Sequence, residues 1–318
     1  CIRIAPALNR PAPAGRMAAA LTFHCPHGAL QSGSATLTSN LFLAVAASHL
    51  HFALISDSLG RQAEFILSDT HRRAPLVLDK PEIAPGAWAA FLRFMPVGME
   101  HVFGGLDHVA FILGLVLLTR RLAPIAIAAT GFTLGHTATL ALAALGALQP
   151  HAPTVEALIG FTIAFVALEA GDAHIARWSL GFAAALSTIA LLAFLNVVHV
   201  AAFAFAGLAV FVYCYKRGLP SGAAAAPWLA AAFGLIHGCG FAGALSTLDL
   251  PRPRLLASLA GFNIGVELAQ LLIIVAALFI GMLASRALGN RAALARAVTA
   301  AGLFALGIHW LAARIIAA

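Results

Sequence analysis

Long apolar runs, separated by short polar or proline-containing breaks, fill the chain from Pro96 to its end. Each run has roughly the 20 residues that an α-helix needs to cross a bilayer. The pattern therefore predicts an all-α polytopic membrane protein with about eight transmembrane helices. The expected spans are residues 97–118, 122–147, 154–171, 178–195, 197–215, 227–248, 255–284 and 292–315.

The stretch from Trp178 to Tyr215 is apolar almost throughout, so it is either one over-long helix or two short helices that turn near Asn196. Short cytoplasmic loops are enriched in Lys and Arg, and this bias separates the two alternatives. A single helix divides the basic residues almost evenly between the two sides. A turn near Asn196 collects Arg120, Arg121, Arg177, Lys216, Arg217, Arg286, Arg291 and Arg296 on one side and leaves Arg252, Arg254 and Arg314 on the other. Two helices are favoured, with the N-terminal part and the C-terminus outside the cytoplasm.

Residues 1–86 have a different pattern, with clusters of Ser and Thr and short alternating stretches at residues 41–45 and 49–55. Alternation of this kind is typical of β-strands. We expect a small β-rich extracytoplasmic domain at residues 1–86 and a transmembrane domain at residues 87–318. Residues 79–86 would link them, and the aromatic segment Trp88–Phe94 would form an interfacial helix.

The first residue is Cys rather than Met, as expected after removal of a signal peptide. Outside the cytoplasm, Cys1 and Cys25 could form a disulfide. Lipidation of Cys1 is the competing reading.

Composition supports a membrane protein, and we expect it in a bacterial-type inner membrane. The chain is 61% hydrophobic and 10% charged, with a mean hydropathy of +0.94, whereas soluble domains carry roughly 25% charged residues. The formal charge of +7 comes from short basic clusters between apolar runs, which membrane topology explains without a nucleic-acid partner. The expected partners are the lipid bilayer and a metal ion, while a homo-oligomer or other membrane subunits are left open.

Two segments recur at an offset of 101 residues. Phe132-Thr-Leu-Gly-His136 resembles Phe233-Gly-Leu-Ile-His237, and Gly160-Phe-Thr-Ile163 resembles Gly261-Phe-Asn-Ile264. Many transporters are built from such internal repeats. The match predicts a parallel duplication of four helices.

Ionisable side chains inside these spans are the candidate functional residues, since each is costly in a bilayer unless it has a partner. In the first span, His101 and His108 lie seven residues apart on one helical face, and Asp107 stands beside His108. Gly104 and Gly105 could kink this helix. An Asp beside a ligand His either binds the metal or orients the imidazole. Interhelical hydrogen bonds are the structural alternative.

The later spans add His136, His237 and a polar stripe of Asn263, Glu267 and Gln270. A lone His in a helix is often a hydrogen-bonded core residue, but the matching positions of His136 and His237 in the repeat favour a shared role. The three residues have helical spacing and could form hydrogen bonds that hold neighbouring helices together. A structural role alone does not explain Glu267, because a buried carboxylate requires a cation, a metal or a proton.

Most of these residues lie at one depth, roughly 14 to 21 Å into the membrane at 1.5 Å per residue. Nearer the span ends, Glu156, Glu169 and His199 would line an approach route together with His101. Imidazoles and carboxylates without thiolates suit Ni, Co, Zn or Fe, and Cys239 is interpreted as packing. The predicted metal ligands are His101, Asp107, His108, His136, His237 and Glu267, with Asn263 and Gln270 as polar support.

The motifs resemble the HupE/UreJ family of nickel and cobalt permeases. His101-x5-Asp107-His108 is similar to its signature, and the later order is similar to its second branch: Thr-Leu-Gly-His136-Thr-Ala-Thr-Leu, Val155-Glu156, Phe233-Gly-Leu-Ile-His237-Gly-Cys-Gly-Phe-Ala and Gly261-Phe-Asn-Ile-Gly-Val-Glu267-Leu-Ala-Gln270. The resemblance implies nickel or cobalt handling by the first-span residues. A second family motif is reduced here to His237-Gly238, with Phe233 at its first His and Gly240 at its Glu.

Three hypotheses follow. The favoured one is a transporter of a divalent transition metal (Ni, Co or Zn). Five histidines of the N-terminal part could capture the ion first, although surface histidines in a small β domain are usually only solvated: His24, His27, His49, His51 and His71. The second is an intramembrane metal-dependent hydrolase with an open metal position, although no HExxH motif is present. The third is a non-transporting assembly or accessory subunit.

Overall fold

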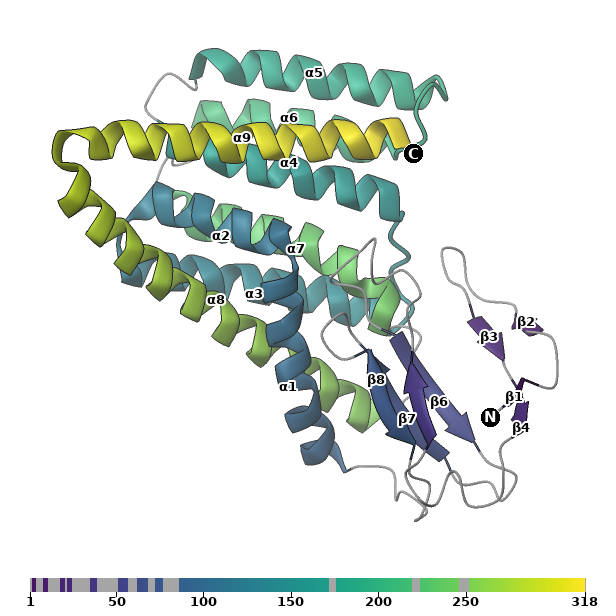
Figure 1. Cartoon of the computed structure of the whole chain (residues 1–318). Helices are drawn as coiled ribbons and strands as arrows, with labels where there is room; N and C mark the ends of the chain where they lie inside the picture. Colours follow the sequence, from purple (N-terminus) through teal and green to yellow (C-terminus); the bar gives the residue numbers. More distant parts are fainter. Residues whose placement is uncertain are drawn as a thin grey trace.

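The computed structural model describes residues 2–3, 8–10, 18–20, 22–24, 35–38, 51–56, 62–67, 72–76, 86–171, 176–218, 224–245 and 252–317. The chain is mainly helical (Figure 1). The helices are α1 (Ala87–Gly104), α2 (Leu106–Thr119), α3 (Leu122–Ala144), α4 (Ala152–Ala170), α5 (Ala176–Phe194), α6 (Ala202–Gly218), α7 (Ala226–Leu245), α8 (Arg252–Leu288) and α9 (Ala292–Ala317), with a short 3-10 turn, Gly289–Arg291, between the last two.

Short strands occupy the described part of the first 86 residues. They pair as antiparallel two-stranded ribbons, the longest being β6 (His51–Ser56) with β7 (Gln62–Leu67). The others are β1 (Ile2–Arg3) with β4 (Phe23–His24), β2 (Leu8–Arg10) with β3 (Ala18–Ala20), and β5 (Ala35–Thr38) with β8 (Arg73–Leu76). The expected strand at 49–55 corresponds largely to β6. The expected strand at 41–45, Cys1, Cys25, His27, His49 and His71 lie outside the described residues.

The first span is broken, which corrects the expectation of one helix at 97–118. The helix starts at Ala87, so the predicted interfacial segment Trp88–Phe94 is simply the beginning of α1. At Gly105 the backbone is extended, and α2 leaves at an angle of 74° to α1. A break at Gly105 therefore places a sharp bend within the first apolar run.

The apolar stretch from Trp178 to Tyr215 forms two helices, as the distribution of basic residues predicted. Asn196 adopts a left-handed conformation (φ 56°) between α5 and α6, a conformation that Asn tolerates better than most residues. Its N–H donates to Ala193 O and the N–H of Val197 donates to Leu192 O, which satisfies the carbonyls at the end of α5.

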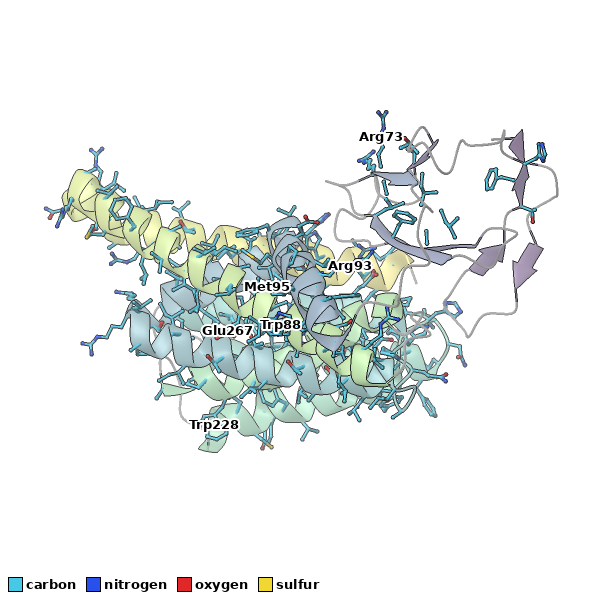
Figure 2. All side chains as sticks on the ribbon, turned by 90° about the horizontal axis from the view of Figure 1, so that it is seen from below. Arg73, Trp88, Arg93, Met95, Trp228 and Glu267 are labelled. Carbon is cyan, nitrogen blue, oxygen red and sulfur yellow. The ribbon has the colours of Figure 1, made fainter. Side chains whose placement is uncertain are left out.

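The helical part has the lengths and apolarity of a multi-pass membrane protein. Within the described residues, Leu122–Ala144, Ala152–Ala170 and Arg254–Ile316 meet a length and hydropathy test for a membrane span, and α1 with α2 meets it as one bent pair. The stretch Arg254–Ile316 folds back on itself as α8 and α9 (Figure 1). Trp88 and Trp228 are largely exposed side chains of α1 and α7, as expected where a protein meets lipid (Figure 2).

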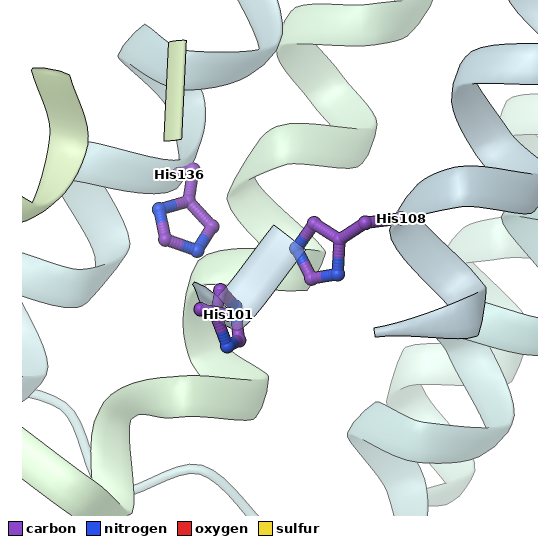
Figure 3. Close-up of side chains that lie close together, drawn as sticks. All are labelled: His101, His108 and His136. Atoms are coloured by element: carbon purple, nitrogen blue, oxygen red, sulfur yellow. The ribbon is translucent and has the colours of Figure 1, made fainter. Parts of the chain in front are cut away.

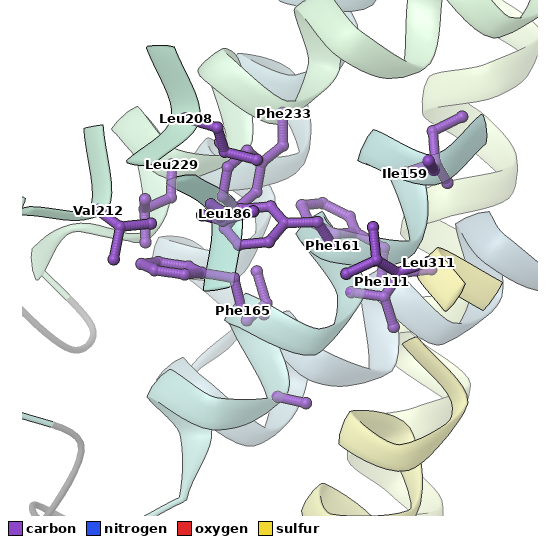
Figure 4. Packing of buried hydrophobic residues seen from close by; sticks show 14 of the residues in the cluster. Phe111, Ile159, Phe161, Phe165, Leu186, Leu208, Val212, Leu229, Phe233 and Leu311 are labelled. Atoms are coloured by element: carbon purple, nitrogen blue, oxygen red, sulfur yellow. The ribbon is translucent and has the colours of Figure 1, made fainter. Parts of the chain in front are cut away.

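A continuous aromatic and aliphatic core fills the space between α2, α4, α6 and α7. Phe111, Phe161 and Phe233 are fully buried in it (Figure 4). The ring of Phe165 packs edge-on against Phe233 with centroids 5.8 Å apart, and it makes a similar contact with Tyr215. This core fixes α7 against the other helices and so positions the polar residues that α7 carries.

Several helices approach closely where one of them presents glycine to the backbone of another. A Cβ on Gly234 of α7 would lie 2.1 Å from Phe132 O of α3, and a Cβ on Gly98 of α1 would lie 2.0 Å from Phe262 O of α8. Small residues permit such contacts between membrane helices, where lipid supplies no hydrophobic drive for association. The glycines bring α3 to α7 and α1 to α8, the helices that frame the site described next.

Substitution of Gly234 by Ala is expected to separate α3 from α7, because the clash is with backbone and cannot be relieved by a side-chain rotation. We expect a destabilisation of at least about 1–3 kcal/mol, measured by thermal unfolding in detergent. Gly302→Ala in α9 is the matched control, since a Cβ there meets no atom within 4 Å. Equal unfolding temperatures for the two variants would contradict this packing.

Candidate metal centre

Three histidines from three helices converge on one point inside the bundle (Figure 3). His101 comes from the last turn of α1, His108 from the first turn of α2 and His136 from the middle of α3. The ring centroids of His101 and His108 are 4.6 Å apart, and His136 lies 6.2 and 6.3 Å from them. One ring nitrogen of each lies within 4.8 Å of the others, close enough to hold a single metal ion.

A second group of donors shares His108. Asp107, His108 and His237 each offer one ligand atom, and these atoms also lie within 4.8 Å of one another. The rings of His108 and His237 have centroids 5.3 Å apart. The four imidazoles are 7% exposed or less, so the cluster lies inside the protein.

The break at Gly105 builds the first half of this cluster. His101 and His108 were expected on one face of a straight helix, with His101 nearer the outer surface; the 74° bend instead brings their rings into edge-to-face contact. Asp107 Oδ1 accepts the backbone N–H of His108 at 2.9 Å and lies 3.0 Å from His108 Nδ1. A Cβ on Gly105 would lie 2.8 Å from Asp107 Oδ1 and 2.9 Å from His108 Nδ1, so no larger residue fits there without moving the donors.

Two further histidines are each held by one hydrogen bond from a neighbouring helix. His136 Nδ1 lies 3.2 Å from Asn263 Oδ1 of α8, and His237 Nε2 lies 3.0 Å from Thr162 Oγ1 of α4. The sequence reasoning named Asn263 as polar support but missed Thr162. The signal was available, because Thr162 and Asn263 occupy the same position of the 101-residue match.

The opposite nitrogens of these rings have no hydrogen-bond partner. Within the part of the chain that the structure describes, His108 Nε2, His136 Nε2 and His237 Nδ1 are buried polar atoms without such a partner. A buried polar group is costly unless it is satisfied, so several such atoms in one cluster require an explanation. A metal-binding histidine typically has one nitrogen oriented by a polar neighbour and the other directed at the ion. The donors present therefore fit a divalent transition metal.

Phenylalanines enclose the donors. Phe132 lies 5.0 Å from His237 and Phe111 lies 5.5 Å from it, while Phe262 lies 5.4 Å from His101, as distances between ring centroids. These rings exclude water from the imidazoles. In so apolar a setting the attraction between an ion and its ligands is stronger than in water.

Glu267 lies in a separate polar group between α3 and α8. Its Oε1 accepts a hydrogen bond from Thr130 Oγ1 at 2.7 Å, and its Oε2 accepts one from Thr133, whose hydroxyl also lies 3.1 Å from Gln270 Oε1. Neither metal-holding group found among the described residues includes Glu267. The polar stripe of α8 therefore divides: Asn263 faces the histidines, and Glu267 with Gln270 faces threonines of α3.

The remaining candidates lie apart from the histidines in the described structure. Glu156 pairs with Arg314 of α9 at 3.0 Å, Glu169 accepts a hydrogen bond from Tyr215 at 3.2 Å, and His199 is exposed between α5 and α6. The thiol of Cys239 lies 3.4 Å from Leu235 O within its own helix, in agreement with a packing role.

Fold and cluster together define the class of protein. This is a mainly helical, multi-pass membrane protein whose buried His side chains and half-buried Asp107 are grouped so that they could hold a metal ion.

The chain belongs to the HupE/UreJ family, since the model described as "HupE / UreJ protein" matches residues 78–209 and 174–314 and so covers most of it. The resemblance of the motifs is thereby confirmed. The two matched regions are displaced by close to the 101-residue offset found in the sequence. No curated protein and no solved structure matches the chain.

Removal of the polar partners tests whether these histidines are oriented for metal. Asn263→Ala and Thr162→Val keep every ligand but free the His136 and His237 rings, and loss of such partners typically lowers metal affinity about 10–100-fold. The measurement is a Ni²⁺ or Zn²⁺ titration of the purified protein. Thr188→Val is the control, since the Thr188 hydroxyl donates to its own helix at Ala184 O. Unchanged affinity in both site variants would contradict this role.

Proposed function

We propose that the chain transports a divalent transition metal ion of the nickel, cobalt and zinc class across the membrane through the buried histidine cluster. The main support for the proposal is the hydrogen bonding of the imidazole nitrogens. His108, His136 and His237 each have one nitrogen beside a polar neighbour and the other buried without a hydrogen-bond partner. The proposed ligands are His101, Asp107, His108, His136 and His237.

Hydrogen bonding between helices does not by itself explain this pattern. A hydrogen bond between helices requires a donor and an acceptor, yet His108 Nε2, His136 Nε2 and His237 Nδ1 have no such partner among the described residues. Neutral imidazoles with one carboxylate are donors that Ni, Co and Zn accept. Family membership supports the same class of substrate, because the HupE/UreJ resemblance implies nickel or cobalt handling.

For the architecture, we propose eight crossings of a bacterial-type inner membrane, counting α1 with α2 as one broken span. The α2–α3 and α8–α9 turns, which carry Arg120, Arg121 and Arg291, lie at one end of the helices, and the C-terminus lies at the other (Figure 1). The positive-inside rule assigns the basic end to the cytoplasm. Residues 1–86 are then an extracytoplasmic domain and residues 87–318 the membrane domain.

We propose that Glu267 helps to hold α3 against α8 rather than binding the ion. Its two carboxylate oxygens accept hydrogen bonds from Thr130 and Thr133, which precede His136 by about two turns and one turn of α3. A rigid α3–α8 pair keeps His136 facing Asn263. Glu267 thus acts on the site through the helices that form it.

Flux through liposomes is the direct test. Purified protein should pass Ni²⁺, Co²⁺ or Zn²⁺ into vesicles containing a metal-sensitive dye, and His108→Ala should reduce the rate to that of protein-free vesicles, because His108 belongs to both donor groups. His199→Ala should retain the wild-type rate, since His199 is exposed outside the cluster. Equal flux in the wild-type and His108→Ala proteins would overturn the transport proposal. Metal binding without flux would instead favour the hydrolase or accessory alternatives.

A further inference from the structure

The two donor groups share one residue and differ in the rest. His101 and His136 belong only to the first group, while Asp107 and His237 belong only to the second; His108 belongs to both. The first group consists of three imidazoles. The second replaces one imidazole by a carboxylate, so an ion would meet different ligands in each.

The repeat explains why there are two groups. His136 and His237 occupy matching positions at the 101-residue offset, and so do the residues that hold them, Asn263 and Thr162. The hydrogen bonds cross between the halves: His136 of α3 contacts Asn263 of α8, and His237 of α7 contacts Thr162 of α4. If each residue is replaced by its match 101 positions away, the His136–Asn263 contact becomes the His237–Thr162 contact. The geometry is that of two related half-sites.

His108 lies between these half-sites. Its ring centroid is 6.3 Å from that of His136 and 5.3 Å from that of His237. Its Nε2 is buried without a hydrogen-bond partner and its Nδ1 lies 3.0 Å from Asp107 Oδ1. In His108, Nδ1 therefore lies beside Asp107, and Nε2 is the nitrogen without a hydrogen-bond partner.

We propose that the cluster contains two overlapping ion positions that share His108 and are occupied in turn by a single ion during transport. The inference rests on the proposed function and adds how the site releases its substrate. In the first position the ion is held by His101, His108 and His136, and in the second by Asp107, His108 and His237. One ligand remains bound throughout, so the ion is never without protein donors in the apolar interior.

Simultaneous occupancy is disfavoured by the chemistry of imidazole. A neutral imidazole has one N–H donor nitrogen and one acceptor nitrogen, so a histidine that binds two metal ions through both nitrogens must also lose its N–H proton and become an imidazolate. Two divalent ions at such close range in an apolar interior also repel one another strongly. A single shared ion avoids both costs, and weak, multiple positions are what conduction requires.

Metal stoichiometry and coordination in single variants test the proposal. Wild-type protein in detergent, loaded with Ni²⁺ and desalted, should retain one ion per chain by elemental analysis. His136→Ala removes a donor of the first position only, and His237→Ala a donor of the second only. Each should still bind one ion, with X-ray absorption indicating more oxygen ligation in His136→Ala than in His237→Ala. Both variants should lose flux, since transfer needs both positions.

The outcomes separate this inference from the proposed function. Loss of all binding in both His136→Ala and His237→Ala would show one site that needs every donor, and two ions per wild-type chain would show simultaneous occupancy; either result overturns the shared-ligand proposal while metal handling stands. Failure of the wild-type protein to bind Ni²⁺, Co²⁺ or Zn²⁺ would overturn the proposed function itself. His136→Gln and His237→Gln repeat the test with similar side-chain volume, and thermal unfolding checks that each variant is folded.

Discussion

The break of the first span at Gly105 is the constraint on which the site depends. A straight helix through residues 97–118 would hold His101 about two turns away from His108 along one face. The bend instead brings their rings into edge-to-face contact and starts a new helix whose first turn contains Asp107 and His108. Asp107 also accepts the N–H of His108, so the carboxylate both orients the ring and satisfies a free amide at the start of α2. An irregular backbone inside a membrane protein is tolerated where it is enclosed by protein, as it is here.

Helix packing holds the other donors against this bend. Gly234 and Gly238 let α7 approach the backbone of α3 at Phe132 and His136, and Gly98 lets α1 approach α8 at Phe262. The same interfaces therefore position His136, His237 and Asn263. Phenylalanine rings pack around the imidazoles, which are buried from solvent. The 101-residue internal match relates the His136–Asn263 contact to the His237–Thr162 contact.

Much of the fold could be predicted because the bilayer constrains it strongly. Span length and apolarity located the helices, and the distribution of Arg and Lys correctly predicted the turn at Asn196. Spacing and depth pointed to Asp107, His108, His136 and His237, which the structure groups together. The position of His101 was predicted wrongly, because its depth was counted along a straight helix axis and the chain bends by 74° between α1 and α2.

The orientation of side chains around a helix was harder to predict than their depth. Glu267 shares the depth of His136 but faces the hydroxyls of Thr130 and Thr133, a choice made by helix packing and not by spacing. Thr162 was missed because a single Thr in an apolar run usually bonds to its own helix. Its hydroxyl does contact Ile159 O at 2.7 Å, yet it also lies beside His237. Only the internal match to Asn263 distinguishes it in the sequence.

The central claim is that buried imidazoles of this cluster bind the metal. An anomalous-scattering map of crystals soaked in Zn²⁺ or Ni²⁺, recorded at the metal edge, tests it most directly. The account predicts a peak adjoining His108, on the side of His101 and His136 or on the side of Asp107 and His237. A map whose peaks lie only at Glu267 or at exposed histidines such as His199 would contradict it.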